Sequence, residues 1–237
     1  MVKLYVCEIS KLIEEVKEDA TVLDTYSDKL GKERMAHILK NSKAEDRACS
    51  LGAALLLLFA LKEEKPEIEV LPDFDYIENG KPYFEQFPSV HFNLSHTKNM
   101  VICGISDMEI GVDIEHIRDI KENTINKVFT DKEKKMAKGE REGYIRLWTM
   151  KEACAKLSGR GLADILDGME IVEANSGTKV EKLNQDIRKA SCVHIVAEGK
   201  LFDSMNCPYL YSVCAQNPCE IKVAHTKWEN SNIMLCN

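Results

Sequence analysis

The sequence predicts an α+β protein built of two similar lobes, and three observations lead to this prediction. Lys43 to Lys62 has a polar first turn and then an apolar run that reaches Leu61, which is typical of a helix buried on all sides. Tyr144 to Leu157 has helical character as well. Strand-like runs of β-branched residues follow both helical segments. Each half of the chain therefore provides a long helix and strands, with a boundary near Ser106-Asp107.

In the first half, Lys3 to Ile9 is expected to form the opening strand, and charged amphipathic stretches continue to about Lys40. After the long helix, Pro66 and Pro72 interrupt regular structure, because proline lacks a backbone donor and has a fixed φ. Two further strands are expected on either side of a connection. They are Val90 to Leu94 and Met100 to Ile105, joined through Ser95-His96-Thr97-Lys98-Asn99.

The second half is expected to begin with a strand from Ile110 to Glu115 and a polar helical region from Asn123 to about Glu142. The helix that follows has a stop signal in Ser158-Gly159-Arg160-Gly161, since glycine adopts the left-handed conformation of a helix C-cap without strain. Three strand-like runs complete the chain: Glu170 to Ala174, Cys192 to Ala197 and Tyr209 to Ala215. The predicted lobes are residues 1–106 and 107–237.

Composition and charge exclude several classes of protein. A chain of 237 residues with 44% hydrophobic and 30% charged residues can bury a sizeable core. A net charge of −7 argues against general nucleic-acid binding, because no excess of cations is available to neutralise a phosphate backbone. Met1 to Ser10 is too polar for a secretion signal, and the apolar run Leu51 to Leu61 is much shorter than the roughly 20 residues that span a bilayer. We expect a soluble cytoplasmic protein without a membrane segment.

The nine cysteines are scattered along the chain and form no CxxC pair. An odd number with irregular spacing fits neither a disulfide framework nor a structural zinc site. We therefore expect free thiols in a reducing cytosol.

Two short segments indicate a reaction. In Gly111-Val112-Asp113-Ile114-Glu115 the two carboxylates point to the same face if the segment is a strand, because side chains alternate along a strand. In the helix, Trp148, Glu152 and Lys156 are spaced by four residues and share one face. Three carboxylates and a lysine suit a Mg²⁺ ion that holds a phosphate ester, and Mn²⁺ accepts the same oxygen ligands. The sequence thus predicts phosphoryl chemistry.

At these residues the chain resembles the 4′-phosphopantetheinyl transferases, in particular their long, Sfp-type branch. The resemblance lies in short segments that occur in the family's order between about residues 80 and 162: Gly80-Lys81-Pro82, His91-Phe92-Asn93-Leu94-Ser95-His96-Thr97, Gly111 to Glu115, Phe129-Thr130-Asp131-Lys132-Glu133, Trp148 to Lys156 and Gly159-Arg160-Gly161-Leu162. Each segment alone is weak evidence for the resemblance, whereas the occurrence of all of them in the family's order is specific evidence.

The resemblance implies a monomer of two α+β lobes related by pseudo-two-fold symmetry, with coenzyme A bound between them. It implies transfer of the phosphopantetheine arm to a serine of an acyl or peptidyl carrier protein, with release of adenosine 3′,5′-bisphosphate. The 107–237 lobe would carry the metal site and the catalytic helix, and the 1–106 lobe would contact the nucleotide.

The resemblance also implies roles for individual residues. Asp113, Glu115 and Glu152 would be the metal ligands, with Glu152 as general base and Asp113 and Lys156 at the reacting phosphate. Coenzyme A would be contacted by the residues Lys81, Ser95, His96, Lys151 and Arg47.

One position departs from the family pattern. The family often has an arginine where this chain has Cys49, and Arg47 lies two residues earlier. Either Arg47 replaces that arginine or the contact with the nucleotide end of coenzyme A is weaker.

Other interpretations remain open for the same residues. Asp113 and Glu115 alone can be surface charges of an edge strand, and Glu152 with Lys156 can be an ordinary i, i+4 ion pair. At the level of function, the alternatives are hydrolysis of a pyrophosphate by the same metal site and a non-catalytic protein that binds coenzyme A or a carrier protein. The acceptor, water or a carrier serine, separates hydrolase from transferase, and product formation separates both from a binding protein.

Overall fold

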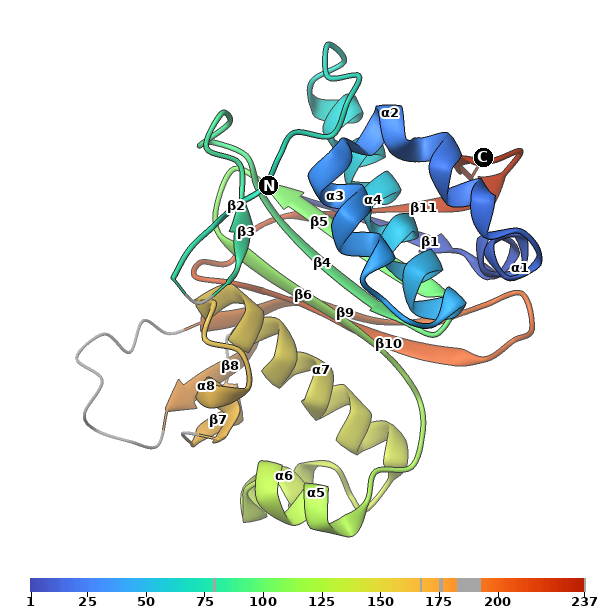
Figure 1. Ribbon diagram of the computed structural model, residues 1–237. Helices are drawn as coiled ribbons and strands as arrows, with labels where there is room; N and C mark the ends of the chain where they lie inside the picture. The colour runs from blue at the N-terminus through green and yellow to red at the C-terminus, as the bar shows by residue number, and fades with distance from the viewer. Residues whose placement is uncertain (79, 167, 175–176, 183–192, 237) are drawn as a thin grey trace.

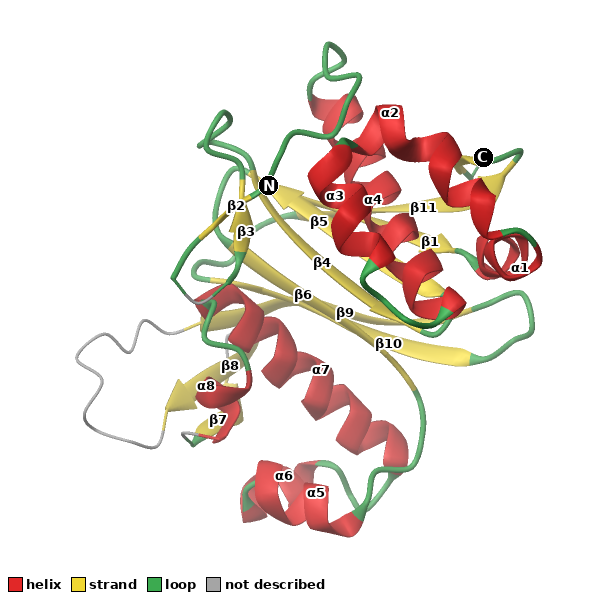
Figure 2. Cartoon of the chain, viewed as in Figure 1, coloured by secondary structure: helices red, strands yellow, loops and turns green. Residues whose placement is uncertain are grey.

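The computed structural model describes residues 1–78, 80–166, 168–174, 177–182 and 193–236 of the chain. Two five-stranded sheets pack against each other in the middle of the molecule, and helices cover their outer faces (Figure 1). A third, two-stranded sheet is formed by β2 (Asp75–Tyr76) and β3 (Pro82–Tyr83). The predicted α+β class is confirmed (Figure 2).

The first sheet has the strand order β12-β11-β1-β5-β4. Its strands are β1 (Val2–Glu8), β4 (His91–Thr97), β5 (Met100–Ser106), β11 (Ile221–Glu229) and β12 (Asn232–Leu235). Between β1 and β2 the chain forms only helices and loops: α1 (Ser10–Glu18), the 3-10 helix η1 (Ala20–Tyr26), α2 (Ser27–Leu30), α3 (Lys32–Leu39) and α4 (Ala44–Glu64).

Helix α4 is the centre of the first lobe's core, as its all-round apolar character predicts. Its side chains from Ala48 to Leu61 are buried with the exception of Phe59, which is half-buried. On the sheet side they pack against Tyr5 and Cys7 of β1 and against inward residues of β5. None of the helices in the described part of the chain is long and apolar enough to cross a membrane.

The second sheet has the order β6-β10-β9-β8-β7. Its strands are β6 (Ile110–His116), β7 (Met169–Ala174), β8 (Gly177–Lys182), β9 (Val193–Phe202) and β10 (Pro208–Ala215). The helices of this lobe are α5 (Glu122–Val128), α6 (Asp131–Met136), α7 (Arg141–Ser158) and α8 (Leu162–Leu166). Helix α7 crosses the outer face of the sheet and ends at Gly159, whose φ of 75° is the predicted left-handed C-cap.

The two lobes repeat one arrangement without a repeat in sequence. In each lobe an opening strand, β1 or β6, is followed by the long helix and then by an antiparallel hairpin, β4–β5 or β9–β10. In each sheet the opening strand pairs antiparallel with the second strand of the hairpin. This common order of elements agrees with the expectation of two similar lobes.

The end of the chain departs from the expected boundary. Strand β11 pairs in parallel with β1, and β12 pairs with β11, so residues 221–235 belong to the first sheet. The expected lobe 107–237 therefore does not include its last two strands. These strands lay outside the predicted elements, because their alternation of polar and apolar residues is weak and exposed side chains predominate.

An apolar layer lies between the two sheets, and it arises because side chains alternate between the two faces of each strand. Alternate residues of β1, β5, β6 and β10 point into this layer, and their neighbours point to α4 or α7. The layer contains Val2, Leu4, Val6, Met100, Ile102, Ile110, Val112, Ile114, Tyr209, Tyr211 and Val213. Because Val112 and Ile114 face the layer, Asp113 and Glu115 must face the opposite side, toward α7.

Several element boundaries differ from the prediction. The expected connection from Ser95 to Asn99 is shorter, because β4 continues to Thr97 and the chain turns at Lys98, which has a φ of 49°. The expected helical region 123–142 consists of α5 and α6, separated by Thr130, whose side chain caps α6. Cys192, the expected first residue of a strand, lies outside the described residues, and that strand continues to Phe202.

The structure pairs Cys154 of α7 with Cys214 of β10 in a disulfide, with Cα atoms 5.5 Å apart. This contradicts the expectation that no cysteine is cross-linked. The sequence contained no indication of it, because the two residues are 60 positions apart and become neighbours only when α7 packs on the sheet.

A peptide map prepared without reductant should therefore contain Cys154 and Cys214 in one cross-linked species. Reduction should lower the free energy of unfolding by about 4 kcal/mol, because it releases a long loop in the unfolded chain. The Cys154→Ser/Cys214→Ser variant should not respond to reductant. Identical unfolding of the wild type with and without reductant, together with separate peptides, would contradict the cross-link.

Candidate active site

The acidic pair lies where β6 meets helix α7. The two elements approach closely at Gly111, where a Cβ atom would lie 1.9 Å from the carbonyl oxygen of Ala153. From this contact onward the alternation of β6 directs Asp113 and Glu115 toward the helix face that carries Glu152 and Lys156. Glycine at position 111 is therefore the local reason why the acidic strand and the helix lie together.

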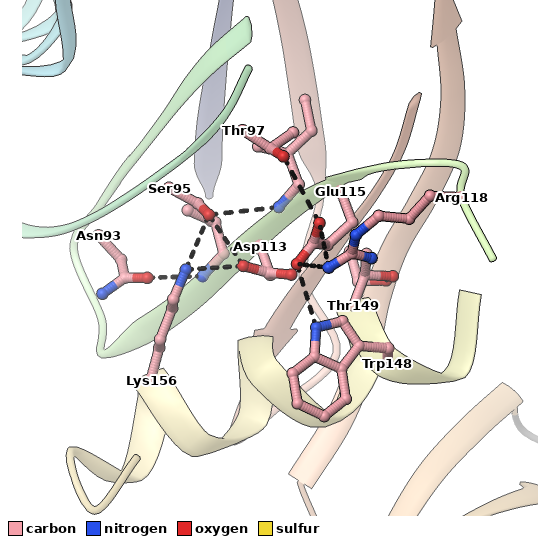
Figure 3. Close-up of polar contacts among 12 residues, drawn as sticks. Asn93, Ser95, Thr97, Asp113, Glu115, Arg118, Trp148, Thr149 and Lys156 are labelled. Carbon is pink, nitrogen blue, oxygen red and sulfur yellow. Dashed lines mark hydrogen bonds and ion pairs between the residues drawn. The ribbon is translucent and has the colours of Figure 1, made fainter. Parts of the chain in front are cut away.

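Strand β4 provides a third row of side chains. Asn93, Ser95 and Thr97 alternate along it and point toward β6 and α7 (Figure 3). Asn93 Oδ1 accepts a hydrogen bond from the backbone N–H of Val112 at 2.8 Å. The backbone N–H of Ile114 donates to Ser95 Oγ at 3.4 Å. These side chains satisfy donors at the free edge of β6 and so join the two lobes.

Asp113, Ser95 and Lys156 form the centre of the site (Figure 3). Lys156 Nζ lies 2.7 Å from Asp113 Oδ1 and 2.8 Å from Ser95 Oγ, and Ser95 Oγ donates to Asp113 Oδ1 at 2.8 Å. Asp113 is buried, whereas Lys156 keeps part of its surface exposed. The arrangement brings together three residues that sequence analysis placed at the reacting phosphate or at coenzyme A.

Glu115 is held at the rim of this centre. Its Oε1 accepts a hydrogen bond from Trp148 Nε1 at 3.1 Å, and its carboxylate lies 3.4 Å from Arg118. Desolvation and the neighbouring charge of Asp113 raise the pKa of Glu115. Trp148, placed by its spacing on the helix face of Glu152 and Lys156, thus acts as a hydrogen-bond donor to the acidic strand.

Glu152 shares this environment but has no hydrogen-bond or ion-pair partner within the described part of the chain. Desolvation, with the charges of Asp113 and Glu115, raises its pKa to about 6, although Lys156 acts in the opposite direction. A half-buried carboxylate with a raised pKa is suited to accept a proton near neutral pH.

The donor set fits a divalent cation. Asp113 Oδ2 is buried and has no partner among the described residues, although buried carboxylate oxygens are normally satisfied. Glu115 and Glu152 carry the unfavourable charge that a cation would relieve. In the described ranges, however, no three acidic, histidine or cysteine side chains already converge into a metal cage.

His96 lies on the other face of β4 from Ser95. Phe92 and Leu94, on the same face as His96, pack into the core around α4. Desolvation and the positive charges of Lys156 and Arg34 lower the pKa of His96, while Asp46 and Asp113 act against them. Ser95 and His96 were both predicted to contact coenzyme A. Ser95 faces the acidic cluster, whereas His96 faces the side of the core around α4.

A cavity of about 500 Å³ lies between α3 and the chain at residues 72–76. Arg34 and His37 of α3 line it, together with Lys40 at the C-cap of that helix. The guanidinium of Arg34 lies 5.2 Å from the ring centre of Phe74. Arg34 Nε is buried without a partner among the described residues. These residues lay outside the set predicted from the sequence, because the cavity forms only where residues 33–40 meet residues 72–76.

Lys151 does not reach the acidic cluster. Its side chain is fully buried, and its ammonium group is 2.8 Å from Val128 O, 2.7 Å from Met169 O and 2.8 Å from a carboxylate oxygen of Glu133. All three donors of the ammonium group are thereby occupied. The expected contact between Lys151 and coenzyme A has no support in this geometry.

Lys81 also lies away from the cluster. Its ammonium group pairs with Glu109 and donates to Ile110 O and Leu157 O, each at 3.2 Å. The last contact satisfies a carbonyl near the C-terminal end of α7. Lys81 lines a cavity of about 210 Å³, so a ligand contact there would involve its aliphatic part or a change of partner.

Arg47 occupies the first turns of α4, and its Nε donates to Asn41 O at 2.7 Å. Cys49 is buried, and its thiol donates to Lys98 O at 3.0 Å. Burial raises the pKa of Cys49 to about 11. The position where the family often has an arginine is therefore packed against the β4–β5 turn and offers no charge to a ligand.

Comparison with known proteins agrees with this arrangement. Residues 109–209 match the profile of the 4′-phosphopantetheinyl transferase superfamily. The chain is 31% identical over 150 residues to 4′-phosphopantetheinyl transferase psf-1 of Bacillus pumilus, covering 61% of each chain. It is 35% identical over 103 residues to 4′-phosphopantetheinyl transferase Sfp of Bacillus subtilis strain 168, covering 41% of this chain and 46% of the relative.

A longer but more distant match extends over almost the whole molecule. The chain is 26% identical over 227 residues to 4′-phosphopantetheinyl transferase gsp of Aneurinibacillus migulanus, covering 90% of this chain and 94% of the relative. The matches to psf-1 and Sfp span less than two thirds of those proteins. The range of the family profile includes β6 and helix α7. Over these stretches the chain is similar to members of the 4′-phosphopantetheinyl transferase superfamily.

Proposed function

We propose that this protein transfers the 4′-phosphopantetheine arm of coenzyme A to a serine of an acyl or peptidyl carrier protein and releases adenosine 3′,5′-bisphosphate. The observation that carries the proposal is the cluster of Asp113, Ser95 and Lys156 beside the carboxylate of Glu152, which no described residue pairs with. A cluster of this kind offers a base, a cation and anionic ligands within one site.

The protein's own residues divide the reaction between them. The carrier serine attacks the phosphorus next to the pantetheine arm, and Glu152 accepts the hydroxyl proton, because its raised pKa favours proton uptake. Lys156 donates to the phosphate oxygens and stabilises the departing nucleotide phosphate, since its ammonium group is already at the cluster's centre. Ser95 orients Lys156 and Asp113.

Asp113, Glu115 and Glu152 would hold Mg²⁺, and Mn²⁺ accepts the same oxygen ligands. When bound, the ion supplies positive charge for the oxygens of the pyrophosphate. Asp113 Oδ2, buried and without a partner in the described ranges, and the raised pKa values of Glu115 and Glu152 support this assignment.

The nucleotide end of coenzyme A would lie on the first lobe. His96 faces that lobe, and Arg34 of the 500 Å³ cavity is among the charges that act on it. Arg34 and Lys40 provide positive charge for a phosphate, and Phe74 and Tyr76 provide aromatic surface, although Glu33 and Asp73 also line the cavity. Arg47 remains a candidate for the same role at the start of α4. We further propose that the protein acts as a cytoplasmic monomer.

Intact-mass measurement of an apo carrier protein tests the proposal. Incubation with this protein, coenzyme A and Mg²⁺ should add the mass of one phosphopantetheine group. The gain should disappear without metal and with Asp113→Ala or Glu152→Ala, whose folding is verified by thermal unfolding. No gain with fatty-acid-type or peptide-type carriers, despite coenzyme A binding, would favour the alternative of a non-catalytic binding protein.

Glu152 should titrate with a midpoint near pH 6 in the metal-free protein, because desolvation and Asp113 oppose its ionisation. Its contribution to stability should be complete below about pH 4.5 and lost as pH rises through about 6. Carbon NMR of labelled glutamate, assigned with Glu152→Gln, measures the midpoint. Addition of Mg²⁺ should lower it. An ordinary midpoint near 4.5 without metal would contradict the predicted environment.

A further inference from the structure

A fully buried ion pair lies directly beside the catalytic residues but does not touch them. Lys151 immediately precedes Glu152 on α7, and Lys151 and Glu133 each have no exposed side-chain surface. Such a pair is costly to bury and is often replaceable by apolar residues without loss of stability. Its presence therefore calls for a role other than stability alone.

We infer that Glu133 and Lys151 are positioning residues, which fix the rotation of α7 and thereby the places of Glu152 and Lys156. We call this pair the lysine clamp. For its kinetic effect the inference rests on the proposed transferase function, whereas its structural effect does not.

Glu133 joins three elements at one carboxylate. One oxygen accepts the backbone N–H of Thr130 at 2.8 Å, which caps α6, and the same oxygen pairs with Lys151. The other oxygen accepts the backbone N–H of Ile171 in β7 at 2.9 Å. Backbone N–H groups at the start of α6 and in β7 thus fix the Glu133 carboxylate. This carboxylate is a fixed acceptor for the ammonium group of Lys151 on α7.

Lys151 completes the joint from the helix side. Its two remaining donors go to Val128 O, at the end of α5, and to Met169 O, at the start of β7. The ammonium group also lies 5.7 Å from the ring centre of Phe129. The three donors therefore have partners on three different segments, one carboxylate and two backbone carbonyls, so the end of the side chain has one position.

The clamp controls rotation because α7 is also held from the other side. Thr149 Oγ1 lies 2.8 Å from Ser212 Oγ of β10, and with 3.6 residues per turn Thr149 and Lys151 point about 160° apart. Two anchors on nearly opposite sides of a helix fix its rotation about its axis. Glu152 points about 100° from Lys151, so a change at the clamp moves its carboxylate.

The test separates position from stability with the double variant Glu133→Gln/Lys151→Met, in which no charge is left buried alone and the side-chain volume is nearly kept. The unfolding temperature should lie well above that of Glu133→Gln alone, because no charge is buried alone, although Val128 O and Met169 O each lose a donor. The kcat for transfer should fall about 10- to 100-fold with a KM for coenzyme A within about threefold. Glu133→Gln alone should lower both kcat and the unfolding temperature. The matched control is Glu198→Gln, which breaks the exposed ion pair with Arg146 of the same helix and should change neither.

A second readout does not depend on transfer. In a Trp228→Phe background, Trp148 of α7 is the one tryptophan left, and its indole donates to Glu115. The double variant should change the emission and the iodide quenching of Trp148, and Glu198→Gln should not. Unchanged Trp148 emission, or recovery of kcat together with the unfolding temperature in the double variant, would overturn the inference. If the wild type does not modify a carrier, the proposed function fails and Trp148 emission alone decides the clamp.

Discussion

Replacement of Glu152 by Gln should lower kcat for transfer about 10²- to 10⁴-fold, the range expected for the loss of a positioned general base. Glutamine has the same shape but cannot accept the serine proton, and it removes one of three negative charges from the site. Because Glu152 has no partner in the described part of the chain and its ionisation is opposed by desolvation, the fold should tolerate the change.

Mass spectrometry of the carrier protein over time measures this rate, and thermal unfolding verifies the fold. Glu142→Gln is the matched control, because Glu142 lies on the same helix in an exposed ion pair with Lys200. That variant should transfer at the wild-type rate. A Glu152→Gln protein with wild-type kcat would remove Glu152 from the proposed mechanism.

Gly111→Ala should lower the free energy of unfolding by about 3 kcal/mol or more. The new Cβ would lie 1.9 Å from Ala153 O and 2.6 Å from Leu157 N. Both are backbone atoms of α7 and cannot rotate away, so strand and helix must separate. Transfer should be lost as well, because the separation moves Asp113 away from Lys156.

Thermal unfolding followed by circular dichroism should show a melting temperature lower by about 10 °C, given the usual relation between free energy and melting temperature for a chain of this size. Gly104→Ala is the comparison, because its Cβ would meet only side-chain atoms of Ile110 and Val112, at 2.8 Å. Side chains can adjust, so the loss should be smaller. A Gly111→Ala protein as stable as the wild type would contradict the close contact of β6 with α7.

Local patterns were sufficient for the elements and for the centre of the site. The apolar run of α4, the glycine stop after α7 and the alternation of β6 each reflect interactions within a few residues of the chain. They placed Asp113 and Glu115 on one strand face and Glu152 with Lys156 on one helix face, and the structure brings these two faces together.

The functions of single charged side chains were less predictable. Lys81, Lys151 and Lys156 all occur in the segments that resemble the family, but only Lys156 reaches the acidic cluster. A lysine side chain is long and flexible, so its partner depends on which acceptors the fold places around it. Arg34 was missed for the same reason, since the cavity that it lines is formed by segments far apart in sequence.

The sequence by itself determined the fold class, the two long helices, the acidic strand and the spacing of Glu152 and Lys156, because these depend on the helix and strand periods. Only the tertiary structure decided that β11 and β12 return to the first sheet, that Ser95 meets Asp113, that Cys154 meets Cys214, and that Lys151 pairs with Glu133. The physical reason is that these contacts join residues separated by many positions. Their free energy depends on how whole elements pack, which no local pattern records.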